Sequence, residues 1–184
     1  MMKKIGFFVG SLRKDSYSKK VAESFARLLP DGYQAVFIEL GELPLYNQDY
    51  DDFGPVPESY QKFRGEVKQL DGVVFVTPEY NRSVPAVLKN ALDVGSRPFG
   101  KSVWDKLPGL IVTVSPGAIG GFGANHHLRQ SLVFLNVPTL QQPEAYVGHI
   151  ADSIAEDGTI IPGTEQFFQT ILDSYLAFLE KLTK

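Results

Sequence analysis

The chain contains no cysteine. This absence excludes disulfide bonds, thiolate nucleophiles, iron–sulfur clusters and cysteine-based zinc sites. Any redox chemistry would therefore require an organic cofactor. The sequence also lacks a long hydrophobic run, because no apolar stretch approaches the roughly 20 residues of a membrane span. We therefore expect no membrane insertion.

Tracts of basic residues are absent as well. The 18 lysines and arginines are outnumbered by 21 aspartates and glutamates, which gives a net charge of -3. No segment is suited to neutralising the phosphates of a nucleic acid, so we expect no such partner. Met1–Gly10 is basic and then apolar, but its apolar run is too short for a signal peptide and no small-residue cleavage site follows. We therefore expect a cytoplasmic protein.

The length and composition are those of an ordinary globular domain. The chain has 184 residues, of which 43% are hydrophobic and 21% charged. This length can bury a full hydrophobic core, and no linker or repeat divides it. We expect a single domain over residues 1–184.

Short apolar runs typical of β-strands alternate with helical patterns along the chain. Helices are expected after the first strand, from Glu58, from a Ser83 N-cap, near 124–135 and from about Thr164. The acidic run Asp49–Asp52 is expected to be a solvated loop. The expected strands are Ile5–Val9, Ala35–Leu40, Val73–Val76, Leu110–Val114 and a fifth near Val137–Leu140 that can resume around Tyr146 and Val147.

Alternation of this kind is the signature of a parallel sheet covered on both faces. Five strands with five helices predict a flavodoxin-like α/β three-layer sandwich. We expect a five-stranded parallel sheet in the order 2-1-3-4-5.

The first polar loop follows the strand Ile5–Val9 and leads into a helix. A phosphate monoester needs several converging donors, and a helix N-terminus supplies backbone N–H groups and a favourable dipole. The loop lacks Gly-x-Gly-x-x-Gly and Gly-Lys-Ser/Thr, which disfavours both a dinucleotide fingerprint and a triphosphate loop. The alternative is a polar turn that only caps the helix. The candidate phosphate donors are the hydroxyls of Ser11, Ser16, Tyr17 and Ser18 and the guanidinium of Arg13.

The second polar loop, Thr77–Asn81, follows the strand Val73–Val76. Pro78 stiffens the backbone and Asn81 tolerates turn conformations. Backbone N–H groups of a stiff loop can pair with the carbonyls and nitrogens of an isoalloxazine ring, and Tyr80 can pack against it. Because open α/β sheets bind ligands at the carboxyl ends of their strands, the two loops together predict a flavin mononucleotide (FMN) site. The alternative is a plain strand-to-helix turn.

Two motifs carry a family resemblance: Gly10-Ser11-x-Arg13-x-x-Ser16 and Pro78-Glu79-Tyr80-Asn81-x-Ser83-x-Pro85-x-x-Leu88-Lys89-Asn90-Ala91-x-Asp93. Together they resemble the NADPH-dependent FMN reductase family, which includes bacterial chromate and quinone reductases and related azoreductases. The resemblance covers nearly the whole chain, because four further segments are also similar: Leu43-Pro44-Leu45-Tyr46, Ser115-Pro116-Gly117-Ala118-x-Gly120-Gly121, His127-Leu128-Arg129-Gln130 and Gln142-Pro143-Glu144.

The resemblance implies a role for each motif residue. Phosphate contacts come from Ser11, Arg13, Ser16 and Ser18. Flavin-ring contacts come from Pro78, Glu79, Tyr80 and Asn81, and the segment Ser115, Pro116 and Gly117 closes the other edge of the ring. Two positions depart from the family: Ser18 stands where asparagine is common, and Val94 where an aromatic residue is common. The second departure is expected to alter packing or an oligomer contact.

We therefore expect an FMN-dependent oxidoreductase that takes electrons from NADPH or NADH. The expected acceptors are quinones, free flavin, azo compounds or metal oxyanions such as chromate. The family resemblance also implies a homodimer or homotetramer. Two alternatives stay open: an FMN electron carrier, and a binding module of the same fold that has lost the flavin.

No side chain is assigned as catalytic, since the flavin itself would carry the chemistry. No metal site is expected either. His126 and His127 are adjacent, so on a helix they point about 100° apart, whereas a shared metal suits an i, i+4 pair. A helix surface or a subunit contact is the expected place for them.

Overall fold

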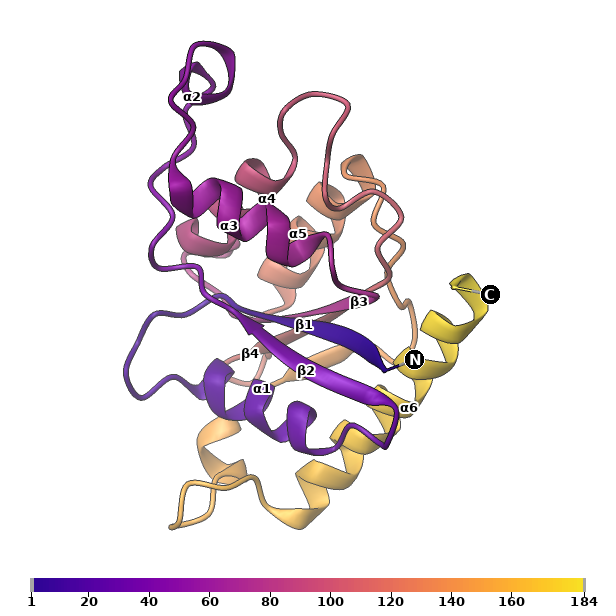
Figure 1. Ribbon diagram of the computed structural model, residues 1–184. Helices are drawn as coiled ribbons and strands as arrows, with labels where there is room; N and C mark the ends of the chain where they lie inside the picture. Colours follow the sequence, from indigo (N-terminus) through magenta and orange to yellow (C-terminus); the bar gives the residue numbers. More distant parts are fainter. Residues whose placement is uncertain (1, 184) are drawn as a thin grey trace.

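The computed structural model describes residues 2–183, and its centre is a five-stranded parallel sheet (Figure 1). The strand order is β2-β1-β3-β4-β5, which confirms the predicted order 2-1-3-4-5. The two central strands β3 and β4 are buried almost throughout, as expected for parallel strands covered on both faces. The strands are β1 (Lys3–Val9), β2 (Tyr33–Ile38), β3 (Gly72–Pro78), β4 (Gly109–Val114) and β5 (Ala145–Val147).

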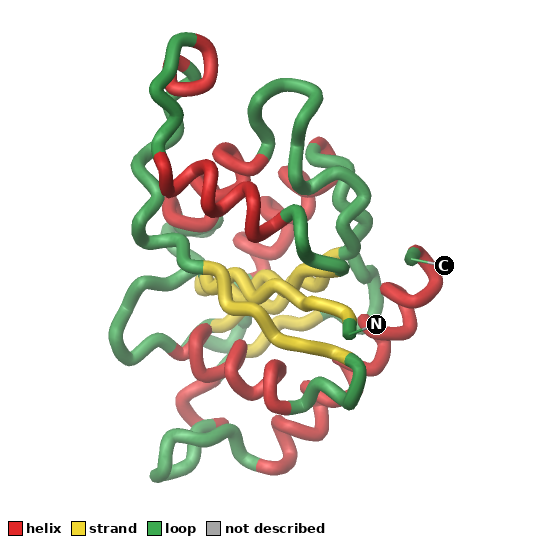
Figure 2. The backbone as a smooth tube through the Cα atoms, viewed as in Figure 1, coloured by secondary structure: helices red, strands yellow, loops and turns green. Residues whose placement is uncertain are grey.

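Helices cover both faces of the sheet, so the three-layer prediction is confirmed (Figure 2). On one face lie α1 (Tyr17–Arg27) and α6 (Pro162–Leu182), where Phe25 stacks on Phe168 at 4.8 Å between ring centroids. On the other face lie α3 (Glu58–Val67), α4 (Ala86–Gly95) and α5 (Phe122–Phe134). Trp104 fills the core there, with its ring 5.3 Å from that of Phe8.

The fifth strand is Ala145–Val147, which pairs with Val112–Val114 of β4. The prediction of a strand at Val137–Leu140 was wrong. That segment makes only an isolated bridge to Gly109, whose N–H donates to the carbonyl of Pro138 at 2.8 Å. The N–H of Leu140 donates in return to the carbonyl of Gly109 at 2.9 Å, but Pro138 has no N–H with which the ladder could extend.

The helix α4 begins at Ala86 and has Pro85 at its N-cap position, so the prediction of Ser83 as the cap was wrong. The chain reverses before the helix: Tyr80 and Ser83 exchange two backbone hydrogen bonds of 3.0 Å. Between them, Asn81 and Arg82 have φ angles of 51° and 65°. This tight turn leaves Ser83 as the partner of Tyr80, two positions too early to cap the helix.

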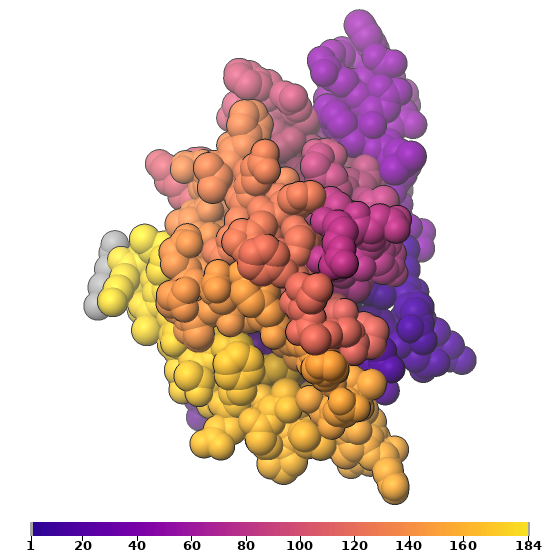
Figure 3. All heavy atoms as spheres, turned by 180° about the vertical axis from the view of Figure 1, so that it is seen from behind, coloured from indigo at the N-terminus to yellow at the C-terminus, as the bar shows by residue number. Residues whose placement is uncertain are grey.

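The acidic run Asp49–Asp52 forms the short helix α2, in a lobe that projects from the body of the molecule (Figures 1 and 3). The prediction of a solvated loop was wrong at Asp51. Its carboxylate makes a bidentate pair with Arg64, with distances of 2.7 and 2.8 Å, and the two side chains are only 4% and 10% exposed. Arg64 Nε also donates to the carbonyl of Val94 at 2.9 Å. This pair fastens the projecting lobe to α3 and α4.

Val94 itself is fully buried, so its departure from the family pattern concerns core packing and not an oligomer contact. A short 3-10 helix, η1 (Ile150–Ser153), precedes α6. Within residues 2–183, no helix combines the length and apolarity needed to cross a membrane.

Candidate functional site

The strand register places the predicted loops side by side. Val9 of β1 pairs with Val76 of β3, and Pro78 of β3 pairs with Val114 of β4. Because neighbouring strands are about 4.8 Å apart, the segments that follow these three strands leave the same edge of the sheet as neighbours. The N–H of Gly10 still donates to the carbonyl of Val76 at 2.9 Å. A Cβ at this position would clash with the side chain of Thr77, so the close approach requires glycine.

The loop after β1 offers a set of donors at the start of α1. Ser16 is the N-cap residue, and its hydroxyl oxygen accepts the N–H of Lys19 at 3.2 Å. The Ser11 hydroxyl oxygen accepts the N–H of Arg13 at 3.4 Å. Both serines thus use an acceptor lone pair and keep their O–H free to donate. The capping alternative and the phosphate prediction are therefore compatible for Ser16.

Further donors lie in the same loop. Within the described part of the chain, no acceptor pairs with the backbone N–H groups of Tyr17 and Ser18, as is usual in the first turn of a helix. Arg13 is exposed and forms no ion pair with any described residue. The Ser18 side chain is buried, at 1% exposure. Two free hydroxyls, two backbone donors and a cation fit a phosphomonoester.

The loop after β3 is stiff and partly open. Pro78 ends the strand, and the turn at Asn81 and Arg82 closes the loop. No described group accepts the backbone N–H of either turn residue. The Tyr80 side chain is 51% exposed and is available to a ligand. Backbone donors beside an exposed aromatic ring fit the edge and face of a flat heterocycle.

Glu79 has a contact that the sequence pattern does not indicate. Its Oε2 accepts the backbone N–H of Ala124 at 3.1 Å, in the first turn of α5. The N-cap residue of that helix is Gly121, which has no side chain to cap it. Glu79 therefore caps α5 from another element, where a negative charge also suits the helix dipole. Its Oε1 pairs with Arg82 at 3.2 Å, and its side chain is 12% exposed.

The hydrogen bond to Ala124 limits which atoms of Glu79 could contact a bound flavin. Because the carboxylate is engaged with α5, the predicted ring contact of Glu79 would come from its backbone. The carboxylate instead ties the loop after β3 to the helix that follows the glycine-rich loop. The two residues are 45 positions apart, so only the tertiary structure reveals the link.

The loop after β4 is fastened at its start. The N–H of Ser115 donates to the carbonyl of Val147 at 2.9 Å, and the Ser115 hydroxyl oxygen accepts the N–H of Gly117 at 3.0 Å. The carbonyl of Gly117 accepts the N–H of His149 at 3.3 Å. Ser115, Pro116 and Gly117 therefore lie in a loop held between β4 and the segment after β5.

A hydrogen-bonded cluster adjoins this loop and was missed by the sequence reasoning. The Tyr146 hydroxyl donates to Glu144 Oε1 at 2.7 Å and lies 3.2 Å from His126 Nε2. The ring of Phe122 lies close to that of His126, with centroids 4.2 Å apart and an interplanar angle of 45°. Burial, and then the hydrogen bond to the Glu144 carboxylate, raise the pKa of Tyr146 to about 12. The phenol therefore stays protonated over the physiological range.

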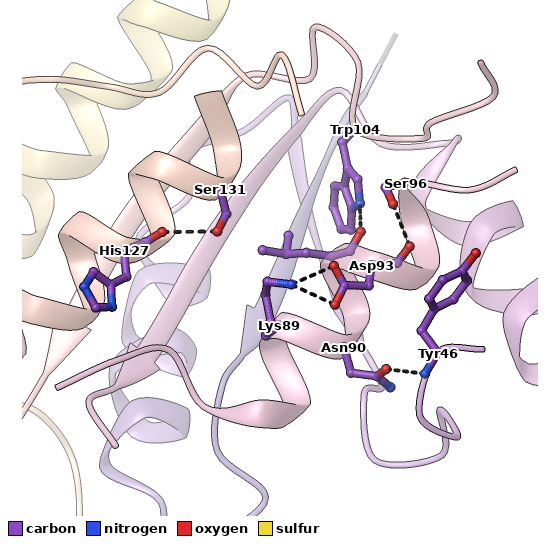
Figure 4. Close-up of polar contacts among 9 residues, drawn as sticks. Tyr46, Lys89, Asn90, Asp93, Ser96, Trp104, His127 and Ser131 are labelled. Carbon is purple, nitrogen blue, oxygen red and sulfur yellow. Dashed lines mark hydrogen bonds and ion pairs between the residues drawn. The ribbon is translucent and has the colours of Figure 1, made fainter. Parts of the chain in front are cut away.

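The second histidine and the helix α4 shape the neighbouring surface. His127 Nδ1 lies 3.0 Å from Ser83 Oγ. Figure 4 shows the Asn90 side chain turned towards the backbone of Tyr46, whose N–H donates to Asn90 Oδ1 at 2.8 Å. Asn90 also donates to the carbonyls of Leu43 and Pro44. The family-like motif at 43–46 is thus held by an amide from α4.

Three cavities lie near the candidate site, and the first includes residues of the candidate phosphate loop. One of about 580 Å³ is lined by Ser11 and Arg13 among others. A second, of about 670 Å³, lies between α4 and α5, and a third, of about 370 Å³, is adjacent to it. None of these three is lined by Pro78–Asn81 or by Ser115–Gly117.

Residues 3–152 match the family model described as NADPH-dependent FMN reductase. The chain belongs to this family. A quinone reductase of Pseudomonas putida is 50% identical over 176 residues, which cover 96% of this chain and 94% of the relative. A 2-hydroxy-1,4-benzoquinone reductase of a Burkholderia species is 45% identical over 181 residues, 97% of each chain.

A solved structure is similar over almost its whole length. The flavoenzyme NAD(P)H:(acceptor) oxidoreductase FerB of Paracoccus denitrificans superposes with a TM-score of 0.90 at 34% identity, covering 98% of both chains. The family resemblance drawn from the motifs is thereby confirmed.

Proposed function

We propose that this protein is an FMN-dependent NAD(P)H oxidoreductase that reduces quinones. The observation that carries the proposal is the joint presence of the donor-rich loop at the start of α1 and the stiff, partly exposed loop after β3 on one edge of the sheet. The family and its quinone-reducing relatives support the same activity. Free flavin, azo compounds and chromate are further acceptors to be tested.

Each loop has a defined task in this proposal. Ser11, Arg13 and Ser16, with the backbone N–H groups of Tyr17 and Ser18, hold the phosphate of FMN. Backbone groups of Pro78–Asn81 and of Ser115–Gly117 hold the two edges of the ring, and Tyr80 borders the substrate face. The bound flavin supplies the hydride and electron transfer that no side chain of a cysteine-free chain offers. The protein's own contribution is to orient both substrates against it.

The test is a purification followed by an assay of turnover. The protein should carry flavin absorbance and should oxidise NADPH or NADH when 1,4-benzoquinone is added. A flavin-loaded protein that fails to oxidise either nucleotide would favour the electron-carrier alternative. A protein that does not retain or bind FMN would favour the binding module.

We also propose that the protein is a homodimer or homotetramer. Large apolar side chains are exposed in the segments 41–57 and 115–123 and could meet a partner subunit. They are Leu45 at 77%, Phe53 at 83%, Ile119 at 58% and Phe122 at 49% exposure. Light scattering at micromolar concentration should give at least twice the 20.4 kDa of one chain. A monomer mass would contradict the proposal.

We also propose a single-domain organisation and a cytoplasmic location. Residues 1–184 are proposed to form one FMN-binding domain, which should unfold in a single cooperative transition. The protein is proposed to work in the cytoplasm, where its nicotinamide donors are available. Cell fractionation that places it in another compartment would contradict this.

A further inference from the structure

The turn after β3 has a backbone conformation that its residues rarely adopt. Asn81 and Arg82 have φ angles of 51° and 65°, which lie in the left-handed region. Asparagine tolerates this region, but the Cβ of arginine crowds the following carbonyl there. Such a conformation persists only where the surrounding structure holds it. Because the same turn carries the exposed ring of Tyr80, the groups that hold it also affect the proposed flavin-ring site.

The helix α5 supplies the surface against which this turn is held. Tyr80 and Ser83 close the turn through their two backbone hydrogen bonds, but these bonds do not fix its place in the molecule. A Cβ on Gly123 would lie 2.8 Å from the carbonyl oxygen of Arg82, so the first turn of α5 is in direct contact with the backbone of the turn. Glu79, which caps α5, pairs with Arg82 at 3.2 Å.

His127 contacts the other end of the turn. Its ring projects from α5, one helical turn after Gly123 (Figure 4). Its Nδ1 lies 3.0 Å from Ser83 Oγ, and this is the one side-chain hydrogen bond of Ser83 within residues 2–183. A hydroxyl group can donate to Nδ1 or accept from it, so the contact exists in either tautomer of the ring. The function proposed above leaves this histidine without a role.

We propose that His127 is a positioning residue for the flavin-ring site. Through Ser83 it holds the turn in the place from which Tyr80 and the backbone N–H groups of Asn81 and Arg82 meet the ring. The inference rests on the function proposed above, because it assigns a support to one of its ring contacts. His127 itself does not touch the flavin. Its effect is therefore confined to the ring and does not extend to the phosphate loop.

The test uses three variants of α5. His127→Ala removes the contact with Ser83, whereas His127→Asn keeps a polar atom close to the place of Nδ1. Gln130→Ala is the matched control, because Gln130 lines the same cavity as His127 but forms no side-chain hydrogen bond with the turn 80–83 in the described part of the chain. Both residues are exposed, so these substitutions should leave the fold intact. Ser83→Ala and the double variant His127→Ala/Ser83→Ala complete a double-mutant cycle.

The first measurement is amide hydrogen exchange in the absence of flavin. The N–H groups of Tyr80 and Ser83 bond to each other's carbonyls, so their exchange rates report the opening of the turn. His127→Ala should accelerate both about three- to tenfold, the scale of one lost hydrogen bond. His127→Asn and Gln130→Ala should stay close to the wild type. In the double variant, the Tyr80 amide should exchange no faster than in His127→Ala.

The second measurement is fluorescence titration with FMN and with riboflavin. Both ligands contain the same ring, and only FMN has the phosphate. His127→Ala should therefore weaken the binding of both by the same factor, about three- to tenfold. The loss of a phosphate contact would weaken FMN binding alone. His127→Asn should restore the affinity for both ligands, and Gln130→Ala should leave it unchanged.

Unchanged exchange of the Tyr80 and Ser83 amides in His127→Ala would overturn the proposal. So would a loss of affinity confined to FMN, an equal effect of Gln130→Ala, an asparagine variant as impaired as the alanine variant, or additive effects in the double variant. If the wild-type protein binds neither flavin, the proposed function fails. The exchange experiment still decides in that case whether His127 holds the turn, because it requires no ligand.

Discussion

The carboxylate of Glu79 accepts the backbone N–H of Ala124 at 3.1 Å, so a residue of the loop after β3 caps the helix α5. Both of the loops proposed to hold the flavin ring are connected to this contact, since α5 directly follows the glycine-rich loop. The spacing between the two edges of the proposed site therefore depends on the carboxylate of Glu79.

Two substitutions of Glu79 should distinguish the effect of its capping hydrogen bond from the effect of its negative charge. Glu79→Ala leaves the first turn of α5 without its cap, which costs about 1 kcal/mol of stability, and it should weaken FMN binding. Glu79→Gln keeps an oxygen that can accept the N–H of Ala124, and it should restore most of both. Thermal unfolding and fluorescence titration with FMN measure the two effects. Equal behaviour of the alanine and glutamine variants would show that the hydrogen bond is not what matters.

Arg13→Ala should weaken FMN binding without a loss of stability. The side chain is exposed and unpaired among the described residues, so it contributes little to folding. A charged hydrogen bond to phosphate contributes about 1.5–3 kcal/mol, or roughly ten- to hundred-fold in affinity. Riboflavin, which lacks the phosphate, provides the control because its binding should not change. Unaltered FMN affinity would exclude the phosphate role.

Asp51→Ala should destabilise the protein by about 3–5 kcal/mol, because it leaves the guanidinium of Arg64 buried without its partner. The pair is bidentate and nearly inaccessible to water. Urea unfolding measures the change. Asp52→Ala, in the same short helix, is the matched control and should cost less than about 0.5 kcal/mol. A loss below about 1 kcal/mol for Asp51→Ala would mean that the lobe around α2 is held by other contacts.

Because of Tyr146, the free energy of unfolding should depend on pH in the alkaline range. Its pKa is raised from 10.0 to about 12 in the folded protein, first by burial and then by Glu144. A raised pKa contributes stability that is complete below the unfolded value of 10.0 and is lost as pH rises towards 12. The difference in stability between the wild type and Tyr146→Phe should therefore be constant up to pH 9 and change above pH 10. A constant difference through pH 11.5 would disprove the shift.

Turnover should follow a ping-pong pattern. Backbone groups of the two loops would hold the edges of the ring, which leaves one face for both substrates. Hydride transfer needs the nicotinamide within about 3–3.5 Å of the flavin, and a quinone needs the same face. The two substrates therefore cannot bind together. Parallel lines in double-reciprocal plots are expected, whereas intersecting lines would require a second binding surface.

The sequence by itself determined the sheet and the position of its ligand-binding edge. The runs at Ile5–Val9 and Val73–Val76 are apolar and β-branched or aromatic, and such runs are stable only when both faces are covered. Polar loops directly after them mark the carboxyl edge, which is where open α/β sheets bind ligands. Fold class, strand order and family therefore follow from local patterns.

Only the tertiary structure decided how the loops are held and which polar groups are buried. Asp51 looks like a solvated residue in the sequence, and only the fold places Arg64 beside it. The sequence likewise gives no sign that the carboxylate of Glu79 accepts the N–H of Ala124. The strand at Ala145–Val147 likewise depends on pairing with β4, whereas Val137–Leu140 makes only an isolated bridge to Gly109. In each case the stabilising contact joins residues that are far apart in sequence. Its free energy depends on burial and geometry, which no local pattern encodes.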